Sequence, residues 1–226
     1  MLKLTYHGHS CFELESDGHR IIVDPFLTGN AHADIKPADV KVEAVLVSHG
    51  HGDHVGDAVE IAKANGCQVV SNFEIANWLG AKGVDVHAMH IGGSWTFPWG
   101  RVKLTPAIHG SSLPDGSYGG QPAGILIFMG GKTVYYAGDT AIHSDMALYG
   151  RLNPMDLALL PIGDNFTMGV DDAVEAALLC KARVVMPIHY DTFPVIPADP
   201  RSFAEKAKAR GITVRVAGFG ETFEVA

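Results

Sequence analysis

Hydrophobic and polar residues alternate near the start of the chain in a pattern that favours short strands separated by polar or glycine breaks. These predicted strands are residues 2–6, 11–15 and 20–23, and they read as an antiparallel meander. Residues 44–48 form an apolar run that is typical of a buried strand. Apolar positions then recur at helical spacing over residues 57–65, and Gly66 is the predicted C-cap.

The rest of the chain repeats this order of strands followed by strand–helix units. The remaining predicted strands are residues 68–71, 84–88, 101–108, 124–129, 133–137, 156–160, 184–187, 212–216 and 222–225, and the remaining predicted helices are residues 73–79, 171–180 and 200–210. Gly130 and Gly131 supply a turn between two of the strands, and residues 115–120 are a candidate mobile loop. With no linker between the halves, the pattern predicts an α/β four-layer αββα sandwich. Residues 1–226 would form a single domain with an internal pseudo-repeat.

Composition narrows the classes of function. Hydrophobic residues make up 47% of the 226 residues and the net charge is −8, so we expect a folded chain with no general attraction for nucleic acid or anionic membranes. No apolar run has the length of a membrane span, and the N-terminus lacks the apolar stretch of a signal peptide. The expectation is a cytoplasmic protein that acts on a small molecule, not on a membrane or a long nucleic acid, with a homo-oligomer left open.

The segment His49-Gly-His51-Gly-Asp53-His54 carries the strongest chemical signal. It follows a predicted buried strand and precedes a helix, where the backbone is not periodic. His49 and His51 can therefore point to one side and Asp53 and His54 to the other, and the intervening glycines allow a tight turn. Such an arrangement fits two cations held about 3.5–4 Å apart.

Three further ligand candidates follow other predicted strands. His109, Asp139 and His189 each come just after an apolar run, at the end of a strand where sheet proteins collect active-site groups. Together with the first segment they complete a set of imidazole and carboxylate ligands without any thiolate. That set suits Zn, Mn, Fe or Ni.

Four other residues are weaker candidates for contact with a substrate. His9 lies near the start of a strand and is a candidate for orienting a ligand or touching the substrate. Asn165 and Thr167 precede a helix, where they would hold an anionic group or only provide cap and loop hydrogen bonds. Tyr190 directly follows His189 and is either a hydrogen-bond donor or a packed aromatic residue.

These motifs together resemble the metallo-β-lactamase superfamily, in order and over nearly the whole chain. The matching positions are Asp24, the segment 49–54, His109, Asp139 and His189. Three stretches, residues 8–12, 161–168 and 187–190, resemble more closely a bacterial and archaeal family of metal-dependent hydrolases related to L-ascorbate-6-phosphate lactonase.

The resemblance implies a role for each position. It assigns His49, His51 and His109 to a first metal, Asp53, His54 and His189 to a second, and Asp139 to both. Asp24 would support the histidine loop. The best-known lactam-cleaving enzymes have a cysteine where this chain has Asp139, which counts against lactam hydrolysis.

The expected function is a dinuclear metal-dependent hydrolase with two divalent ions per chain, Zn or Mn first and Fe or Ni next. A metal-bridging hydroxide would attack an ester or lactone, for example of a phosphorylated sugar acid. Asp53, or a water on the second metal, would return a proton to the leaving group, and Asp139 would hold both ions. Two alternatives stay open: a phosphodiesterase or nuclease, and a metal-binding module without enzymatic activity.

Overall fold

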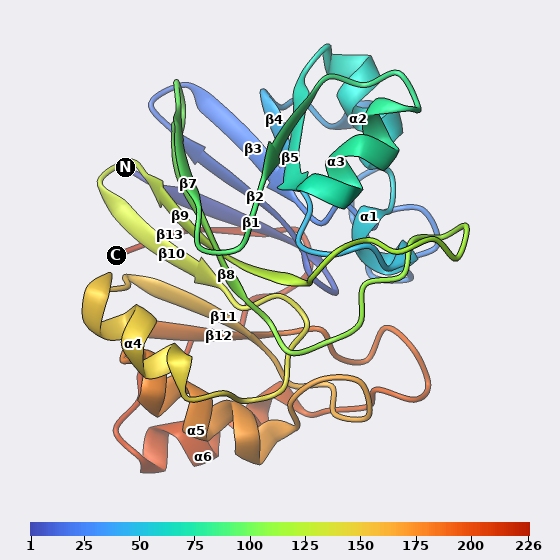
Figure 1. Cartoon of the computed structure of the whole chain (residues 1–226). Coiled ribbons are helices and arrows are strands. Elements are labelled where there is room, and N and C mark those ends of the chain that lie inside the picture. Colours follow the sequence, from blue (N-terminus) through green and yellow to red (C-terminus); the bar gives the residue numbers. More distant parts are fainter.

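The computed structural model describes residues 1–226, and its strands form two sheets (Figure 1). The first sheet has the order β13-β1-β2-β3-β4-β5-β6 and the second has the order β12-β11-β10-β9-β8-β7. The strands of the first sheet are β1 (Lys3–Gly8), β2 (Cys11–Ser16), β3 (His19–Val23), β4 (Ala44–Leu46), β5 (Gln68–Asn72), β6 (Val86–Met89) and β13 (Glu221–Glu224). Those of the second are β7 (Ser94–Phe97), β8 (Gly100–Pro106), β9 (Ala123–Met129), β10 (Lys132–Tyr136), β11 (Leu157–Pro161) and β12 (Val184–Ile188).

Both sheets have the same arrangement of antiparallel and parallel strands, as the predicted pseudo-repeat requires. In the first, β1, β2 and β3 pair antiparallel, and β3, β4, β5 and β6 then pair parallel. In the second, β7 to β10 are antiparallel, and β10, β11 and β12 are parallel. The parallel parts need crossover connections, and helices supply most of them.

The helices cover the outer faces of the two sheets. They are η1 (Pro37–Asp39), α1 (Gly52–Val55), α2 (Ala58–Asn65), α3 (Phe73–Gly80), α4 (Asp145–Leu152), α5 (Val170–Cys180) and α6 (Pro200–Ala209). In Figure 1, α2 and α3 lie on the first sheet at the top, and α4, α5 and α6 lie below the second. Three buried hydrophobic clusters of 27, 18 and 17 residues fill the interfaces, as expected for four layers. The predicted αββα sandwich is confirmed.

Several local predictions are also confirmed. Gly66 ends α2 with a left-handed conformation, at φ 59°. Gly130 and Gly131 both have positive φ in the turn between β9 and β10, a conformation that glycine adopts without strain. Residues 115–120 form the predicted loop, in which Leu113 N donates to Ser117 O and Gly119 N to Ser111 O, and its mobility stays a prediction.

Other elements differ from the sequence pattern. Residues 212–216 do not form a strand, because only an isolated bridge between Val185 and Val214 connects them to β12. Strand β7 and helix α4 were not predicted: three of the four β7 residues are exposed, and α4 buries only Met146. Both elements are short and mostly exposed, so each offers only a few apolar positions as a signal for sequence prediction. No helix has the combined length and apolarity needed to cross a bilayer.

Candidate metal centre

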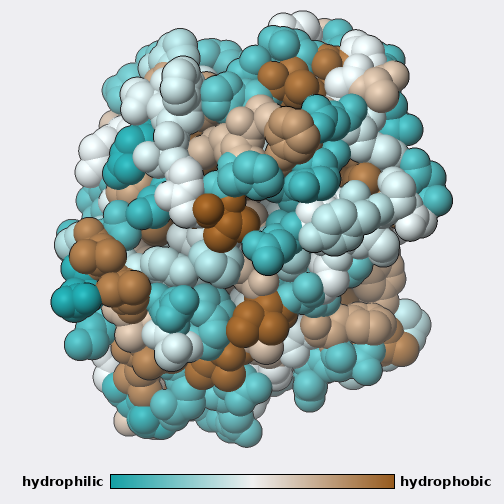
Figure 2. Space-filling model, in the orientation of Figure 1, coloured by the Kyte–Doolittle hydropathy of each residue, from teal (hydrophilic) through white to brown (hydrophobic).

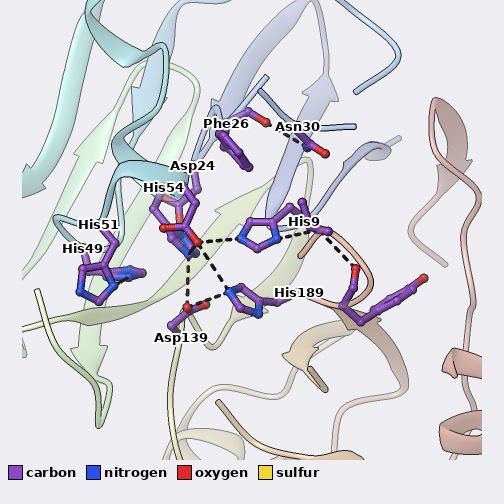
Figure 3. A network of polar contacts seen from close by, with 12 residues as sticks. His9, Asp24, Phe26, Asn30, His49, His51, His54, Asp139 and His189 are labelled. Carbon is purple, nitrogen blue, oxygen red and sulfur yellow. Dashed lines mark hydrogen bonds and ion pairs between the residues drawn. The ribbon is translucent and has the colours of Figure 1, made fainter. Parts of the chain in front are cut away.

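The predicted ligands meet at one end of the sandwich because each of them follows a strand that runs toward that end. His9 follows β1, Asp24 follows β3, and the 49–54 segment follows β4 in the first sheet; His109, Asp139 and His189 follow β8, β10 and β12 in the second. Figure 3 shows the side chains from both sheets turned toward one another. Residues up to 180 positions apart in the chain thus form one site: His9 and His189 have their ring centroids 4.1 Å apart.

His49, His51 and His109 form what we term the first metal group. One ring nitrogen from each lies within 4.8 Å of the others, and Nε2 of His49 is 3.0 Å from Nδ1 of His51. Burial lowers the pKa of all three imidazoles, most strongly that of His49. Neutral imidazoles are the form that binds a metal ion.

His9, Asp53, His54 and His189 form the second metal group, again with ligand atoms within 4.8 Å of one another. The three histidines are buried, whereas 26% of the Asp53 side chain is exposed. Burial would raise the pKa of the Asp53 carboxyl, but the hydrogen bond from His9 and the charge of His54 hold it well below its ordinary value. This group therefore brings its own negative charge, which the first group does not.

Asp139 lies between the two groups. Its Oδ2 is 2.9 Å from Nε2 of His189, 3.3 Å from Nε2 of His54 and 3.6 Å from Nε2 of His109. Burial alone would raise the pKa of this carboxyl, but the imidazoles of His189 and His54 hold it well below its usual range. One ionised oxygen thus faces ligand atoms of both groups.

Asp24 lies behind His54 and accepts four hydrogen bonds. Its Oδ2 accepts from His54 Nδ1 at 2.7 Å, from Tyr136 Oη at 2.6 Å and from Ser48 Oγ at 2.5 Å, and its Oδ1 accepts from Ser48 N at 2.7 Å. This leaves little room for a metal ion on the carboxylate. It fixes the His54 ring with Nε2 directed toward Asp139, as carboxylates commonly do behind metal-binding histidines.

His9 connects the two sheets at the site. Its Nε2 is 3.1 Å from Asp53 Oδ2, its Nδ1 is 2.9 Å from Thr192 Oγ1, and its carbonyl accepts a hydrogen bond from His189 N. Burial lowers the pKa of His9 to about 4. His9, Asp24 and His189 have positive φ values of 54°, 43° and 55°, a conformation that is uncommon for residues other than glycine and is concentrated at functional sites.

Two buried polar atoms without hydrogen bonds indicate that the ligand residues fit a metal ion. His54 Nε2 and Asp139 Oδ1 are buried without any hydrogen-bond partner, and such orphaned polar atoms are rare in folded proteins. Both belong to residues that line the space between the two groups. An ion bound there would give a partner to this ring nitrogen and this carboxylate oxygen, neither of which has a hydrogen bond within the chain.

Not all the predicted substrate residues join this cluster. Asn165 and Thr167 lie on the turn before α5, where Asn165 N donates to Asp164 Oδ1 and Thr167 Oγ1 to Met168 O. Tyr190 packs in the hydrophobic cluster between the second sheet and its helices, and burial raises the pKa of its hydroxyl to about 12.

Five further residues contact the site but were not predicted from the sequence. Ser48 has a local signal, since it directly precedes His49, and its Oγ lies 3.0 Å from His49 Nδ1. Tyr136, Thr192, Phe26 and Phe193 have none, because only folding brings them to Asp24 or His9.

The chain is similar to known proteins over most of its length. The profile of the β-lactamase superfamily domain matches residues 19–190. A UPF0173 metal-dependent hydrolase of Bacillus cereus (strain B4264) is 58% identical over 210 residues, which cover 91% of this chain and 92% of that protein. A UPF0173 metal-dependent hydrolase of Anoxybacillus flavithermus is 52% identical over 228 residues, covering 99% and 100%.

A solved structure is similar over the same length. Igni18, described as a novel metallo hydrolase of the hyperthermophilic archaeon Ignicoccus hospitalis, is 40% identical, with a TM-score of 0.89 over 99% of this chain and 98% of that one. The resemblance in the sequence motifs is therefore confirmed at the level of the family. The chain belongs to the metallo-β-lactamase superfamily and, within it, to the UPF0173 family of metal-dependent hydrolases.

Proposed function

We propose that this chain is a dinuclear metal-dependent hydrolase that hydrolyses esters or lactones. His49, His51 and His109 hold one ion, Asp53, His54 and His189 hold the other, and Asp139 contacts both. The observation that carries the proposal is the position of Asp139 Oδ2, within 3.6 Å of ring nitrogens from both groups. Both sheets supply ligands, so residues 1–226 act as one hydrolase domain.

The chemistry divides between the ions and the side chains. Two divalent ions, when bound, lower the pKa of water and stabilise the negative charge that develops on the attacked group. In the proposed reaction a water oxygen bonds to the acyl carbon, the carbon–oxygen bond to the alcohol breaks, and a proton moves to the alcohol oxygen. Asp53 carries that proton, since its side chain is partly exposed at the site.

The surrounding side chains keep the ligands in place during this reaction. Asp24 fixes the ring of His54 through Nδ1, and Ser48 Oγ lies beside Nδ1 of His49. His9 contacts Asp53 Oδ2 and so restricts the carboxylate that handles the proton. These contacts preorganise the ligands, which is worth free energy at the transition state.

For the metal we propose Zn or Mn, with Fe and Ni as further candidates, because imidazole and carboxylate ligands suit all four. The resemblance to L-ascorbate-6-phosphate lactonase makes the lactone of a phosphorylated sugar acid one candidate substrate, and an uncharged lactone or ester is the other. In either case the partner is a small molecule.

Phosphodiester hydrolysis is the second candidate function, because a dinuclear site also suits attack on phosphorus. The experiment is to load the protein with Zn or Mn and to measure hydrolysis of δ-valerolactone, p-nitrophenyl acetate and bis-p-nitrophenyl phosphate, with metal content on the same sample. We expect more than one ion per chain and faster cleavage of the lactone or ester. Faster cleavage of the phosphodiester would favour the second function. A loaded protein that cleaves none of them would favour a binding module.

A further inference from the structure

Positive side chains are absent from the segments that surround the metal centre. None of the 17 Lys and Arg residues lies in residues 24–35, 47–62, 107–122, 137–150, 162–169 or 189–200. The ion pairs of Asp24, Asp53 and Asp139 are all with histidines. The lysines and arginines that form ion pairs do so elsewhere, for example Lys132 with Asp156. A phosphate on the substrate, away from the bond that breaks, would find no cationic partner here.

The backbone near the site does not replace the missing cations. In the turn before α5, the N–H groups of residues 164–168 all donate within the chain: Asp164 to Met168 O, Asn165 to Asp164 Oδ1, Phe166 and Thr167 to Asp164 O, and Met168 to Thr140 O. The first turn of α5 also carries Asp171 and Asp172. Their negative charge opposes the binding of an anion at this helix terminus.

Apolar side chains are present instead. The rings of Phe26 and Phe193 lie 5.5 Å and 5.4 Å from the ring of His9, and 6.1 Å from each other; Figure 3 shows Phe26 beside His9. Both rings are only partly buried. We call these two residues the aromatic pair. Its position places an apolar surface directly beside the second metal group.

Three further apolar side chains are more exposed than the aromatic pair. Ile108, which precedes His109, is 55% exposed; Phe166 is 56% exposed and Val195 54%. The turn that carries Phe166 lies against His189, since a Cβ at Gly163 would be 2.3 Å from His189 O. On the face shown in Figure 2, hydrophobic residues form separate patches among hydrophilic ones. Ligand sites in proteins are lined mostly by apolar and aromatic side chains together with a few polar groups, which is the combination that the aromatic pair and the second metal group present.

We infer that the metal centre acts on an uncharged ester or lactone that carries an apolar substituent, and that this substituent packs against the aromatic pair. The inference rests on the proposed ester or lactone hydrolysis and narrows its substrate class. Water adds to the acyl carbon, the ring carbon–oxygen bond breaks, and the alcohol oxygen takes up a proton. The hydroxy acid so formed releases one proton at neutral pH, so its carboxylate is the only charge and arises in the reaction.

Three six-membered lactones test the inference on the full-length, metal-loaded chain. δ-Decalactone is uncharged and apolar, glucono-δ-lactone is uncharged and polar, and 6-phosphoglucono-δ-lactone carries a phosphate. After subtraction of spontaneous opening, we expect kcat/KM for δ-decalactone to be at least about tenfold higher than for the other two. Either polar lactone as the best substrate overturns the inference and leaves lactone hydrolysis standing. If no lactone and no p-nitrophenyl ester is cleaved, the proposed function itself fails, and the inference fails with it.

Two variants test the surface that would hold the substituent. Phe193→Ala and Phe26→Ala should each lower kcat/KM for δ-decalactone by about five- to tenfold and change that for glucono-δ-lactone less than twofold, roughly. Trp95→Ala is the matched control, because Trp95 is also an exposed aromatic residue, at 54%, but lies on β7. It should leave both lactones unchanged. Equal losses for both lactones in the Phe193→Ala variant would contradict the inference.

A binding measurement separates this contact from catalysis. 3-Pentylcyclohexanone has CH2 in place of the ring oxygen of δ-decalactone and keeps the pentyl group at the same ring position, but it has no bond that water can cleave. We expect Phe193→Ala to weaken its binding, measured by calorimetry on the metal-free chain, by about fivefold, and Trp95→Ala to have no effect. Unchanged binding in Phe193→Ala would show that the apolar part of the substrate does not contact the aromatic pair.

Discussion

The two metal groups use the same kind of ligand in different surroundings. The first group consists of three imidazoles, and it has no carboxylate of its own; 12% of the His109 side chain is exposed. The second group has buried histidines, includes Asp53, and is supported from behind by Asp24. Asp139 lies closer to the second group, at 2.9 and 3.3 Å against 3.6 Å.

Each group has three histidines, so the number of histidines does not distinguish them. The second group differs because it includes the Asp53 carboxylate and because Asp24 holds the ring of His54. Coulomb attraction to a divalent ion is larger where carboxylates are present and water is excluded. A buried ligand is also harder to remove without harm to the fold. We therefore expect the second group to bind its ion more tightly and to be coupled more strongly to stability.

Removal of the metal should have the largest effect. Dialysis against a chelator should abolish hydrolysis while circular dichroism stays that of a folded protein, because the three hydrophobic clusters do not depend on the ions. Titration of Zn or Mn into this apoprotein, followed by calorimetry, should show two steps. A single step, or saturation well below one ion per chain, would contradict the comparison.

Next come His51→Ala and His54→Ala, which change one ligand in each group. Both should lower turnover by at least about a thousandfold, since each removes a ligand of an ion that acts on the water or on the developing oxyanion. Their effects on stability should differ. His54→Ala removes a donor from the buried Asp24 and leaves a cavity, so its metal-free form should lose about 2–4 kcal/mol in urea unfolding.

His51 is the matched control for this loss, because it is only partly buried and has no buried carboxylate partner. His51→Ala should change the stability of the metal-free protein by less than about 1 kcal/mol. Equal destabilisation by the two substitutions would mean that support by Asp24 does not distinguish the groups.

Asp139→Asn tests the residue that the groups share. The amide keeps the shape of the side chain but loses its charge, so we expect weaker binding of one ion and a loss of at least about a hundredfold in turnover. The melting temperatures of the metal-free variant and the metal-free wild type should differ little. Metal content, turnover and melting are to be measured on the same preparation. Two tightly held ions with intact activity would show that Asp139 does not contact both.

Tyr136→Phe should have the smallest effect. It removes one of four donors to Asp24, which should reduce the stability of the metal-free protein by about 1–2 kcal/mol and lower turnover less than about tenfold. Tyr135→Phe is the control, because Tyr135 is equally buried but its hydroxyl has no hydrogen-bond partner. A loss as large in the control would show that the contact with Asp24 is not the cause.

The sequence predicted best the features that depend on neighbouring residues. The buried strands β4 and β11, helix α5 and the turn at Gly130 have strong local patterns, and the structure contains all of them. Prediction failed where an element is exposed, as at β7. It also failed where an apolar segment does not pair with a strand along its length. Residues 212–216 are such a case, because they touch β12 at a single bridge.

By itself, the sequence determined that His49, His51, Asp53 and His54 lie in one short segment after a buried strand, since this spacing is local. It also supplied His109, Asp139 and His189 as candidates at strand ends, although nothing in one sequence measures the distances between them. Only the tertiary structure decided that Asp139 faces both metal groups, that Asp24 supports His54, and that His9 contacts Asp53. The physical reason is that two sheets with the same plan pack face to face, so strand ends from distant parts of the chain meet at one edge. Side-chain contacts across that edge depend on packing and not on sequence spacing.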